Sequence, residues 1–186
     1  MEAQERQLVL DQMTTSRALL ERLTGGLTPP QWTFHETPER WSIAENIEHV
    51  ITVERRITGL MGKLLQQPGE PEKCVQAAGK DEVVQAGGVN RGVKFVAPEA
   101  VRPVGKWSDP AELMAEFGKT REATIDFVRE TQGNLREHFI MHMAFGELDC
   151  YQWLILLSRH GVRHAAQIEE IKADPAFPAR TAATAG

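Results

Sequence analysis

Cysteine is scarce in this sequence. The 186 residues include two, Cys74 and Cys150, and neither belongs to a CxxC pair. One disulfide between them is compatible with the sequence, but two free thiols in a cytoplasmic protein are the interpretation we favour. Neither cysteine has an activating neighbour in the sequence, which disfavours a cysteine nucleophile.

Long hydrophobic runs and an excess of basic residues are also missing. The longest apolar run near the C-terminus, WLILL (153–157), is far too short to span a bilayer. The charged start MEAQERQ has no apolar segment typical of a secretion signal. Acidic and basic residues are interspersed, with a formal net charge of -5. We therefore expect a cytoplasmic protein that binds neither a membrane nor nucleic acid.

The common motifs for nucleotide binding and serine hydrolysis do not occur. The sequence has no GxGxxG after a strand, no GxxxxGK[ST] and no GxSxG. Phosphate-binding loops and a serine nucleophile of the hydrolase type are therefore disfavoured.

Helical patterns dominate what the sequence does contain. With 41% hydrophobic and 25% charged residues, the chain is typical of one globular domain, which we place at residues 1–174. Four segments have apolar residues spaced three and four apart, as on one face of a helix: 2–26, 41–65, 108–132 and 148–174. Residues 28–31 predict a short helical turn. These elements and the near absence of strand patterns predict an all-α four-helix bundle.

Capping residues and apolar stripes define these helices. Ser42 with Glu45, Asp109 with Glu112, and Asp149 with Gln152 each match a capping box. The predicted buried stripes are Val9, Met13, Leu20 and Leu23; Ile43, Ile47, Val50, Ile57, Met61 and Leu64; Leu113, Phe117, Ile125 and Val128; and Leu154, Leu157, Gly161, His164, Ile168 and Ile171.

The connection 66–108 interrupts the helical pattern. It contains four prolines and six glycines, so a continuous helix is not expected there. A connection of this length is typical of a functional loop, a disordered segment or a crossover between the ends of a bundle. Residues 93–97 predict a short extended segment, and residues 175–186 predict a mobile tail.

Two histidines four residues apart lie in SRHGVRH (158–164), on the last predicted helix. Side chains at this spacing share a face, about 6 Å apart along the axis, and can converge on one ion. His164 lies on the predicted inward stripe and His160 beside it, where a bundle would ordinarily place leucine. A buried imidazole needs partners for both nitrogens, and a metal ion supplies one of them. Gly161, between them, is expected to leave room beside the ion.

A third ligand must come from another helix, and His49 is the candidate. It lies at the flank of its helix's apolar stripe, near Val53 and Leu60, although a surface histidine at that boundary is the alternative. Glu45, one turn earlier, is a candidate general base for a metal-bound water. Its capping box with Ser42 already explains that glutamate.

The other histidines and the tryptophans have simpler interpretations. His138 and His142 repeat the four-residue spacing, but they precede Gly146 where one element ends and another begins. We expect these two to be structural or to neighbour the site. His35 is expected in a surface loop, and Trp32, Trp41, Trp107 and Trp153 are expected in the core or at helix ends.

The chain resembles the DinB superfamily of helical bundles. The segments that carry the resemblance are WSIAENIEHV (41–50), KFVAPEAVRPVGKWSDPAELMAEFGKTR (94–121) and FGELDCYQWLILLSRHGVRHAAQIEEI (145–171). The resemblance implies up-down-down-up helix order with 66–108 as the crossover, and a metal site at His49, His160 and His164. It also implies zinc or nickel as the metal and a homodimer.

Two classes of function follow. The first is a metal-dependent enzyme that activates water or a low-molecular-weight thiol, for hydrolysis or S-transfer on a small molecule. The resemblance implies that related proteins include thiol-dependent S-transferases and isomerases, and also metal-dependent hydrolases. The second is a non-catalytic bundle, in which the metal is structural or absent and dimerisation is the function. Three ligands without an evident fourth favour an open, reactive site over a closed structural one.

Overall fold

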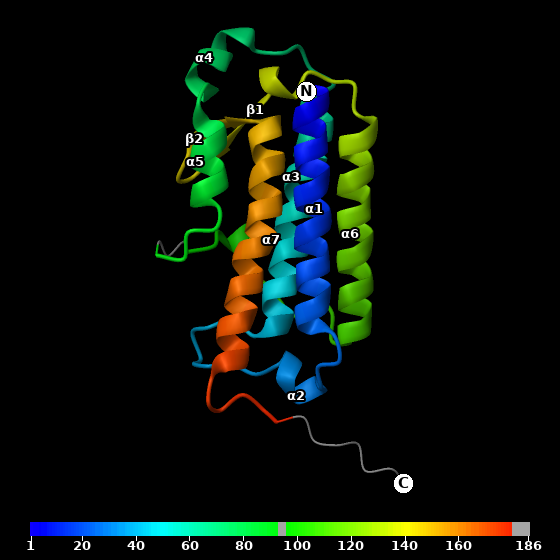
Figure 1. The fold of residues 1–186 in the computed structure, drawn as a ribbon, viewed down its shortest axis with the longest axis vertical. Helices are drawn as coiled ribbons and strands as arrows, with labels where there is room; N and C mark the ends of the chain where they lie inside the picture. Colours follow the sequence, from blue (N-terminus) through cyan, green and yellow to red (C-terminus); the bar gives the residue numbers. More distant parts are fainter. Residues whose placement is uncertain (93–95, 180–186) are drawn as a thin grey trace.

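Four long helices form the body of the protein in the computed structural model, which describes residues 1–92 and 96–179. They are α1 (Ala3–Thr24), α3 (Ile43–Leu64), α6 (Pro110–Glu130) and α7 (Cys150–Ala173). In Figure 1, α1 and α7 run in one direction and α3 and α6 in the other. The predicted all-α four-helix bundle with up-down-down-up order is confirmed.

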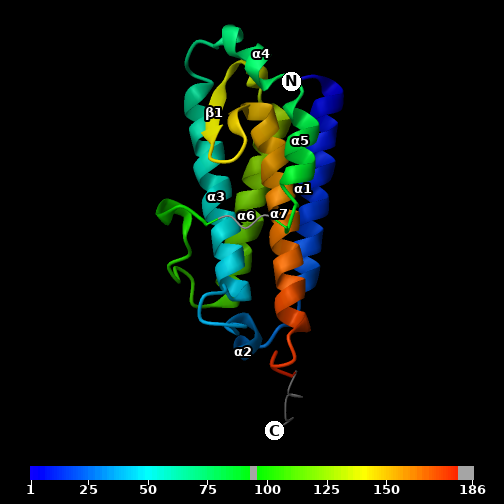
Figure 2. The ribbon, with the colours of Figure 1, turned by 90° about the vertical axis from the view of Figure 1, so that its left-hand side faces the viewer.

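The parallel pair α3 and α6 accounts for the long connection. A chain that leaves the end of α3 must return along the bundle before it can start α6 in the same direction. The connection contains the short helices η1 (Pro71–Lys73), α4 (Cys74–Ala77), α5 (Lys80–Gly87) and η2 (Glu99–Val101). Figure 2 shows α5 lying along α7. Residues 93–95 of the predicted extended segment lie outside the described residues, and residues 96 and 97 form no strand.

The helix starts follow the predicted capping pattern, with one exception. Capping boxes are present at Ser42 of α3, at Asp149 of α7 and at Thr28 of the short helix α2 (Pro29–Trp32). At α6, the Asp109 carboxylate instead accepts a hydrogen bond from the Ala111 N–H at 2.9 Å. The capping box predicted between Asp109 and Glu112 is therefore wrong. Asp109 is the N-cap, but its carboxylate accepts from the N–H of Ala111 and not from that of Glu112.

A β-hairpin before α7 is missing from the prediction. The strands β1 (Phe139–His142) and β2 (Gly146–Asp149) pair antiparallel, after the turn of helix η3 (Leu135–Glu137). Strands of four residues are too short to show a clear alternation of apolar and polar residues. Tertiary contacts hold the hairpin: the Trp153 indole N–H donates to the Ile140 carbonyl at 2.9 Å, and Lys80 Nζ donates to the Glu147 carbonyl at 2.8 Å.

The predicted stripes face one another in the core. All of their residues are buried except Leu64, which is partly buried at the end of α3. A charged pair lies among them, because Arg121 and Glu54 are joined at 2.9 Å with side chains that are almost completely inaccessible to solvent. Both cysteines are free, as expected.

The start of the predicted tail lies against the bundle. The Phe177 ring packs edge-on against Phe34, with centroids 5.5 Å apart, and Gln31 Nε2 donates to the Pro178 carbonyl at 2.8 Å. Of the helices described, none combines the length and apolar character needed to cross a bilayer.

Candidate metal centre

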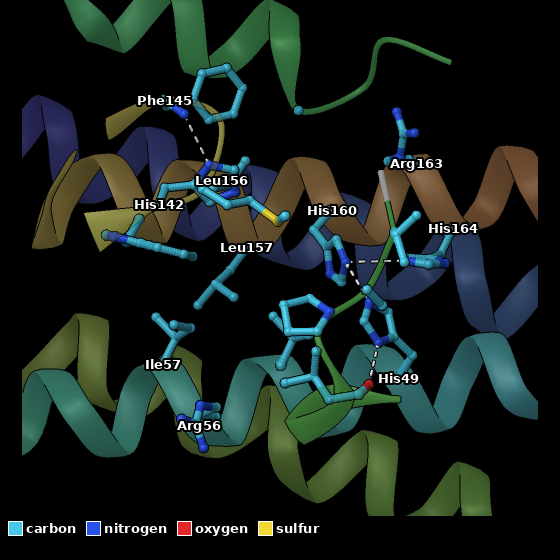
Figure 3. Close-up of a pocket in the computed structure, with 18 of the residues that line it drawn as sticks. His49, Arg56, Ile57, His142, Phe145, Leu156, Leu157, His160, Arg163 and His164 are labelled. Carbon is cyan, nitrogen blue, oxygen red and sulfur yellow. Dashed lines mark hydrogen bonds between the residues drawn. The ribbon is translucent and has the colours of Figure 1, made fainter. Parts of the chain in front are cut away.

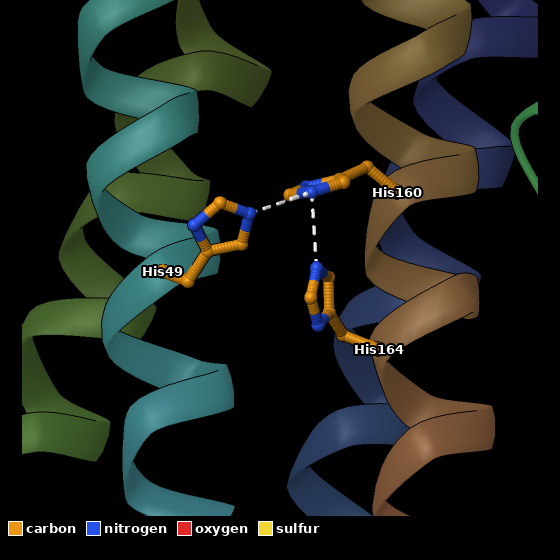
Figure 4. A group of neighbouring side chains, drawn as sticks. All are labelled: His49, His160 and His164. Atoms are coloured by element: carbon orange, nitrogen blue, oxygen red, sulfur yellow. Dashed lines mark hydrogen bonds between the residues drawn. The ribbon is translucent and has the colours of Figure 1, made fainter. Parts of the chain in front are cut away.

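Three histidines from two antiparallel helices meet in the middle of the bundle. His49 comes from α3, while His160 and His164 lie one turn apart on α7. Their Nε2 atoms point at one another, as Figure 4 shows: His160 Nε2 lies 3.2 Å from that of His49 and 3.0 Å from that of His164. The sequence thus named the three side chains that the fold brings together.

The second nitrogen of two of these rings is held by a hydrogen-bond acceptor. His49 Nδ1 lies 2.6 Å from the Val101 carbonyl, and His164 Nδ1 lies 2.7 Å from Asn46 Oδ1. Both oxygens only accept, so both Nδ1 atoms must carry the proton. The neutral rings of His49 and His164 therefore direct unprotonated Nε2 lone pairs toward His160.

This arrangement suits a cation better than a proton. His160 Nε2 can donate one hydrogen to one of its two neighbours, which leaves the other lone pair facing nitrogen at close range. A cation between the rings would accept all three lone pairs. Two nitrogens bound to one tetrahedral zinc stand about 3.3 Å apart. The two separations from His160 Nε2 are close to this value, and all three ligand atoms lie within 4.8 Å of one another. The donor set and its spacing fit a divalent metal ion.

Burial keeps these imidazoles neutral. It lowers the pKa of His49 and holds the pKa values of His160 and His164 well below the ordinary value of 6.5. The Trp41 ring adds to the shielding, since it packs against His49 with centroids 4.8 Å apart and lies nearly parallel to His164. Neutral imidazole is the form that binds metal ions.

The crossover loop is attached beside the site through Glu48. Its buried carboxylate accepts hydrogen bonds from the backbone N–H groups of Val104, Gly105 and Lys106, at 2.9 to 3.3 Å. Gly105 has a φ of 71°, which favours glycine at this turn. This contact holds the loop close to η2, from which the Val101 carbonyl reaches His49.

A cavity of about 400 Å³ opens beside the three histidines. Helices α3 and α7, the crossover and the β-hairpin form its walls, as Figure 3 shows. Most of the lining is apolar: Trp41, Val53, Ile57, Val96, Ala97, Pro98, Ala100, Val101, Met141, Met143, Phe145, Trp153, Leu156 and Leu157. Gly87 lets the hairpin close this wall, because a Cβ there would lie 2.6 Å from the Phe145 ring. A small organic molecule could reach the histidines through this space.

Comparison with known proteins identifies the family. Residues 12–168 match the DinB superfamily. The chain belongs to the DinB superfamily. It is 25% identical over 148 residues to YuaE, an uncharacterised protein of Bacillus subtilis strain 168, covering 79% of this chain and 86% of YuaE.

A solved structure shares the DinB fold. YfiT from Bacillus subtilis, described as a probable metal-dependent hydrolase with an unusual four-helix bundle topology, superposes with a TM-score of 0.58. The match covers 92% of this chain and 88% of YfiT, at 12% sequence identity. This similarity supports the fold of the bundle.

Glu45, the candidate base, is engaged at the start of α3. Its carboxylate accepts from the Ser42 N–H at 2.7 Å and lies 3.5 Å from Nε2 of the exposed His35. Glu45 is not among the described residues that line the cavity. Its role as a general base stays a prediction, and the capping role is the one visible in this DinB bundle.

The second histidine pair separates in the fold. His138 is structural, with its ring nitrogens 2.9 Å from the Asn134 carbonyl and 3.1 Å from the Gln67 carbonyl. His142 lies in β1 and lines the cavity beside Trp153. His138 and His142 are four residues apart but do not lie on one helix, so this spacing does not place them on a common face.

One expectation about the neighbourhood of the site is wrong. The missing side chain of Gly161 faces away from the histidines, because a Cβ there would lie 3.4 Å from Arg121 Nη2 and from Ser16. Trp41 lies directly before α3 and Trp153 is buried in the core, as expected, and both also line the cavity. Asn46, which supports His164, is not distinguished by the sequence pattern. Its one signal is a polar side chain next to the apolar Ile47 on a buried helix face.

Proposed function

We propose that this DinB protein is a metal-dependent enzyme in which His49, His160 and His164 hold one divalent cation. The observation that carries the proposal is the convergence of three Nε2 atoms, in which a single hydrogen on His160 cannot satisfy the lone pairs of both His49 and His164. Borderline ions such as zinc or nickel match an all-imidazole donor set. The description of YfiT as a probable metal-dependent hydrolase supports the same class of function.

The surrounding residues would serve to orient and protect the reacting groups. The Val101 carbonyl and the Asn46 amide fix two ligand rings, and such outer contacts raise metal affinity. Trp41 covers the ligands from one side. When bound, the ion would lower the pKa of a water or a low-molecular-weight thiol and so provide a nucleophile near neutral pH. Water leads to hydrolysis of a small molecule, and a thiol leads to S-transfer.

The adjoining cavity favours an enzyme over a non-catalytic bundle. A structural zinc site is closed by four protein ligands, whereas three histidines leave a position open. That position would face a space large enough for a small organic substrate. The homodimer that the family resemblance implies is part of the proposal and is checked by light scattering.

Metal analysis tests the proposal directly. Protein purified without a nickel column is expected to contain about one equivalent of zinc or nickel, and less than about half an equivalent would count against an enzyme. His160→Ala is expected to lose the metal and remain folded. His35→Ala is the matched control, since His35 is exposed and outside the cluster, and it is expected to keep the metal.

Activity screens then separate the reactions. Esters and amides report hydrolysis, while low-molecular-weight thiols with electrophiles report transfer. If His160→Ala unfolds the protein, a structural ion and the non-catalytic alternative are favoured.

A further inference from the structure

The polar groups of the cavity are all neutral or cationic. Among the described lining residues there is neither an aspartate nor a glutamate. The polar or charged ones are the three clustered histidines, His142, Gln167, Arg56 and Arg163. An organic cation would find no compensating charge in this space, whereas an organic anion would find several donors.

Arg56 is a guanidinium at the cavity wall without an ion pair among the described residues. It is exposed on α3, seven residues after His49. Seven residues are two helical turns, so Arg56 lies on the same face as His49, about 10 Å further along the axis. The neighbouring Arg55 differs, because its guanidinium is paired with Glu116 at 2.6 Å and does not line the cavity.

His142 offers a hydrogen-bond donor at the same level of the bundle. Its ring lies 5.2 Å from the ring of Trp153, which precedes His160 by seven residues on α7. Because α3 and α7 are antiparallel, Trp153 and Arg56 are displaced from the three histidines in the same direction. Figure 3 shows Arg56 and His142 toward one end of the cavity and the three histidines toward the other.

Backbone contacts fix which nitrogen of His142 carries the proton. His142 Nδ1 accepts from the N–H groups of Ala144 and Phe145, at 3.1 and 3.2 Å. The neutral ring therefore carries its hydrogen on Nε2. Nε2 has no partner among the described residues and is not fully enclosed, so this N–H is available to a ligand. Stacking on Phe145, with centroids 4.8 Å apart, holds the ring in place.

We propose that the cavity binds a small apolar molecule carrying a carboxylate, which Arg56 and His142 bind at the end remote from the three histidines. A guanidinium binds a carboxylate through two parallel hydrogen bonds, and the His142 Nε2–H adds a third donor. The apolar body lies along the wall formed by Ile57 and Leu157. If this molecule is the substrate, the inference rests on the function proposed above. The reactive part of the substrate then lies about 10 Å from its carboxylate.

Calorimetric titration with octanoate and octylamine, a pair that differs in the sign of the charge, tests the anion site. In metal-free protein, octanoate is expected to bind at least about tenfold more tightly than octylamine. Arg56→Gln is expected to weaken octanoate at least about fivefold, and Arg55→Gln is expected to leave it unchanged. Any one of three results would overturn the inference: octanoate does not bind, octylamine binds as tightly as octanoate, or Arg56→Gln binds octanoate as tightly as the parent protein.

A pair of His142 variants separates binding from folding. Asn at this position can still accept the two backbone hydrogen bonds but lacks the distal N–H, whereas Gln places an N–H close to the position of Nε2. His142→Asn is expected to weaken octanoate about fivefold, and His142→Gln to retain it. Equal losses in both variants would remove His142 from the site.

Metal content distinguishes this inference from the proposed function. Octanoate binding that depends on Arg56 in a protein that takes up no zinc would retain the anion site and reject the metal-dependent enzyme. The protein could instead bind one equivalent of zinc while Arg56→Gln leaves octanoate affinity unchanged, both with and without zinc. That result would reject the anion site and retain the metal-dependent enzyme.

Discussion

The three clustered histidines are oriented by groups that have little in common. His49 is held by a backbone carbonyl from the crossover, and His164 by the Asn46 side chain, one turn before His49 on α3. Asn46 is itself fixed, since its Nδ2 donates to the Ser42 carbonyl at 2.8 Å, which leaves Oδ1 as the acceptor. Asn46 thus links the start of α3 to the ligands on α7.

Asn46→Ala is expected to weaken zinc binding by about 10-fold to 100-fold, because His164 would lose the acceptor that orients its ring. Asn46→Asp keeps an acceptor in place and is the control, with affinity expected to remain at least as high as in the parent protein. Competition with a chelating dye measures both. Equal zinc affinity in Asn46→Ala and the parent would show that Asn46 does not orient the ligand.

Acid is expected to destabilise the metal-free protein from about pH 6.5 downward. Burial lowers the pKa of His49 and holds the pKa values of His160 and His164 well below 6.5, while the unfolded chain takes up protons near 6.5. Below that pH the unfolded state binds more protons, so the free energy of unfolding falls as pH falls. Urea denaturation at about pH 7.5 and about pH 5.5 measures the difference.

A variant separates this effect from general acid denaturation. His164→Asn removes one titrating ring and is expected to show a smaller loss of stability between the two pH values. An identical loss in the variant would mean that other groups cause the pH dependence.

Individual site residues were predictable to different degrees. The four-residue spacing of His160 and His164 on a helical stripe is a local pattern, and His49 follows from its place beside a second stripe. Asn46 resembles any polar residue near a buried face, and the Val101 carbonyl has no signature at all because every residue carries one. The orienting groups could be found only in the folded chain.

Among the helices and loops, the attachment of the crossover to α3 depends on one carboxylate. Glu48→Ala removes the acceptor of three backbone N–H groups and is expected to reduce stability by about 2 kcal/mol. Cleavage by trypsin after Lys106 should become faster. Glu99→Ala, an exposed change in the same connection, is the control. Unchanged cleavage in Glu48→Ala would show that the loop is held by other contacts.

The close approach of α7 to α1 and α6 leaves Gly161 against Ser16 and Arg121. Because a Cβ there would make ordinary contacts at 3.4 Å, Gly161→Ala is expected to stabilise the helix by about 0.5 to 1 kcal/mol. Zinc content should not change, since this face points away from the three histidines. A loss of zinc in Gly161→Ala would restore the interpretation that this glycine makes room for the ion.

For the bundle as a whole, the buried pair of Arg121 and Glu54 joins three helices. Arg121 Nη2 donates to Glu54 of α3 at 2.9 Å, and Nη1 donates to the Met13 carbonyl and the Ser16 hydroxyl of α1. Glu54→Ala is expected to destabilise the protein by about 3 kcal/mol or more, since a buried charge loses its partner. Thermal or urea unfolding measures this loss.

The double variant Glu54→Leu with Arg121→Met is expected to regain most of that stability, because apolar side chains can replace a buried ion pair. A double variant less stable than Glu54→Ala would show that the pair is required for the packing of the bundle.

The sequence by itself determined the four helices, their buried stripes and three histidines that share a site. Caps and periodicity act between residues within a few positions of each other, so they can be read along the chain. Only the tertiary structure decided that the hairpin forms, that His142 joins the cavity and that Gly161 faces Arg121. These features depend on contacts such as that between Lys80 and the Glu147 carbonyl, which are 67 residues apart. Local preferences do not encode such distances, because packing of the whole chain selects which surfaces meet.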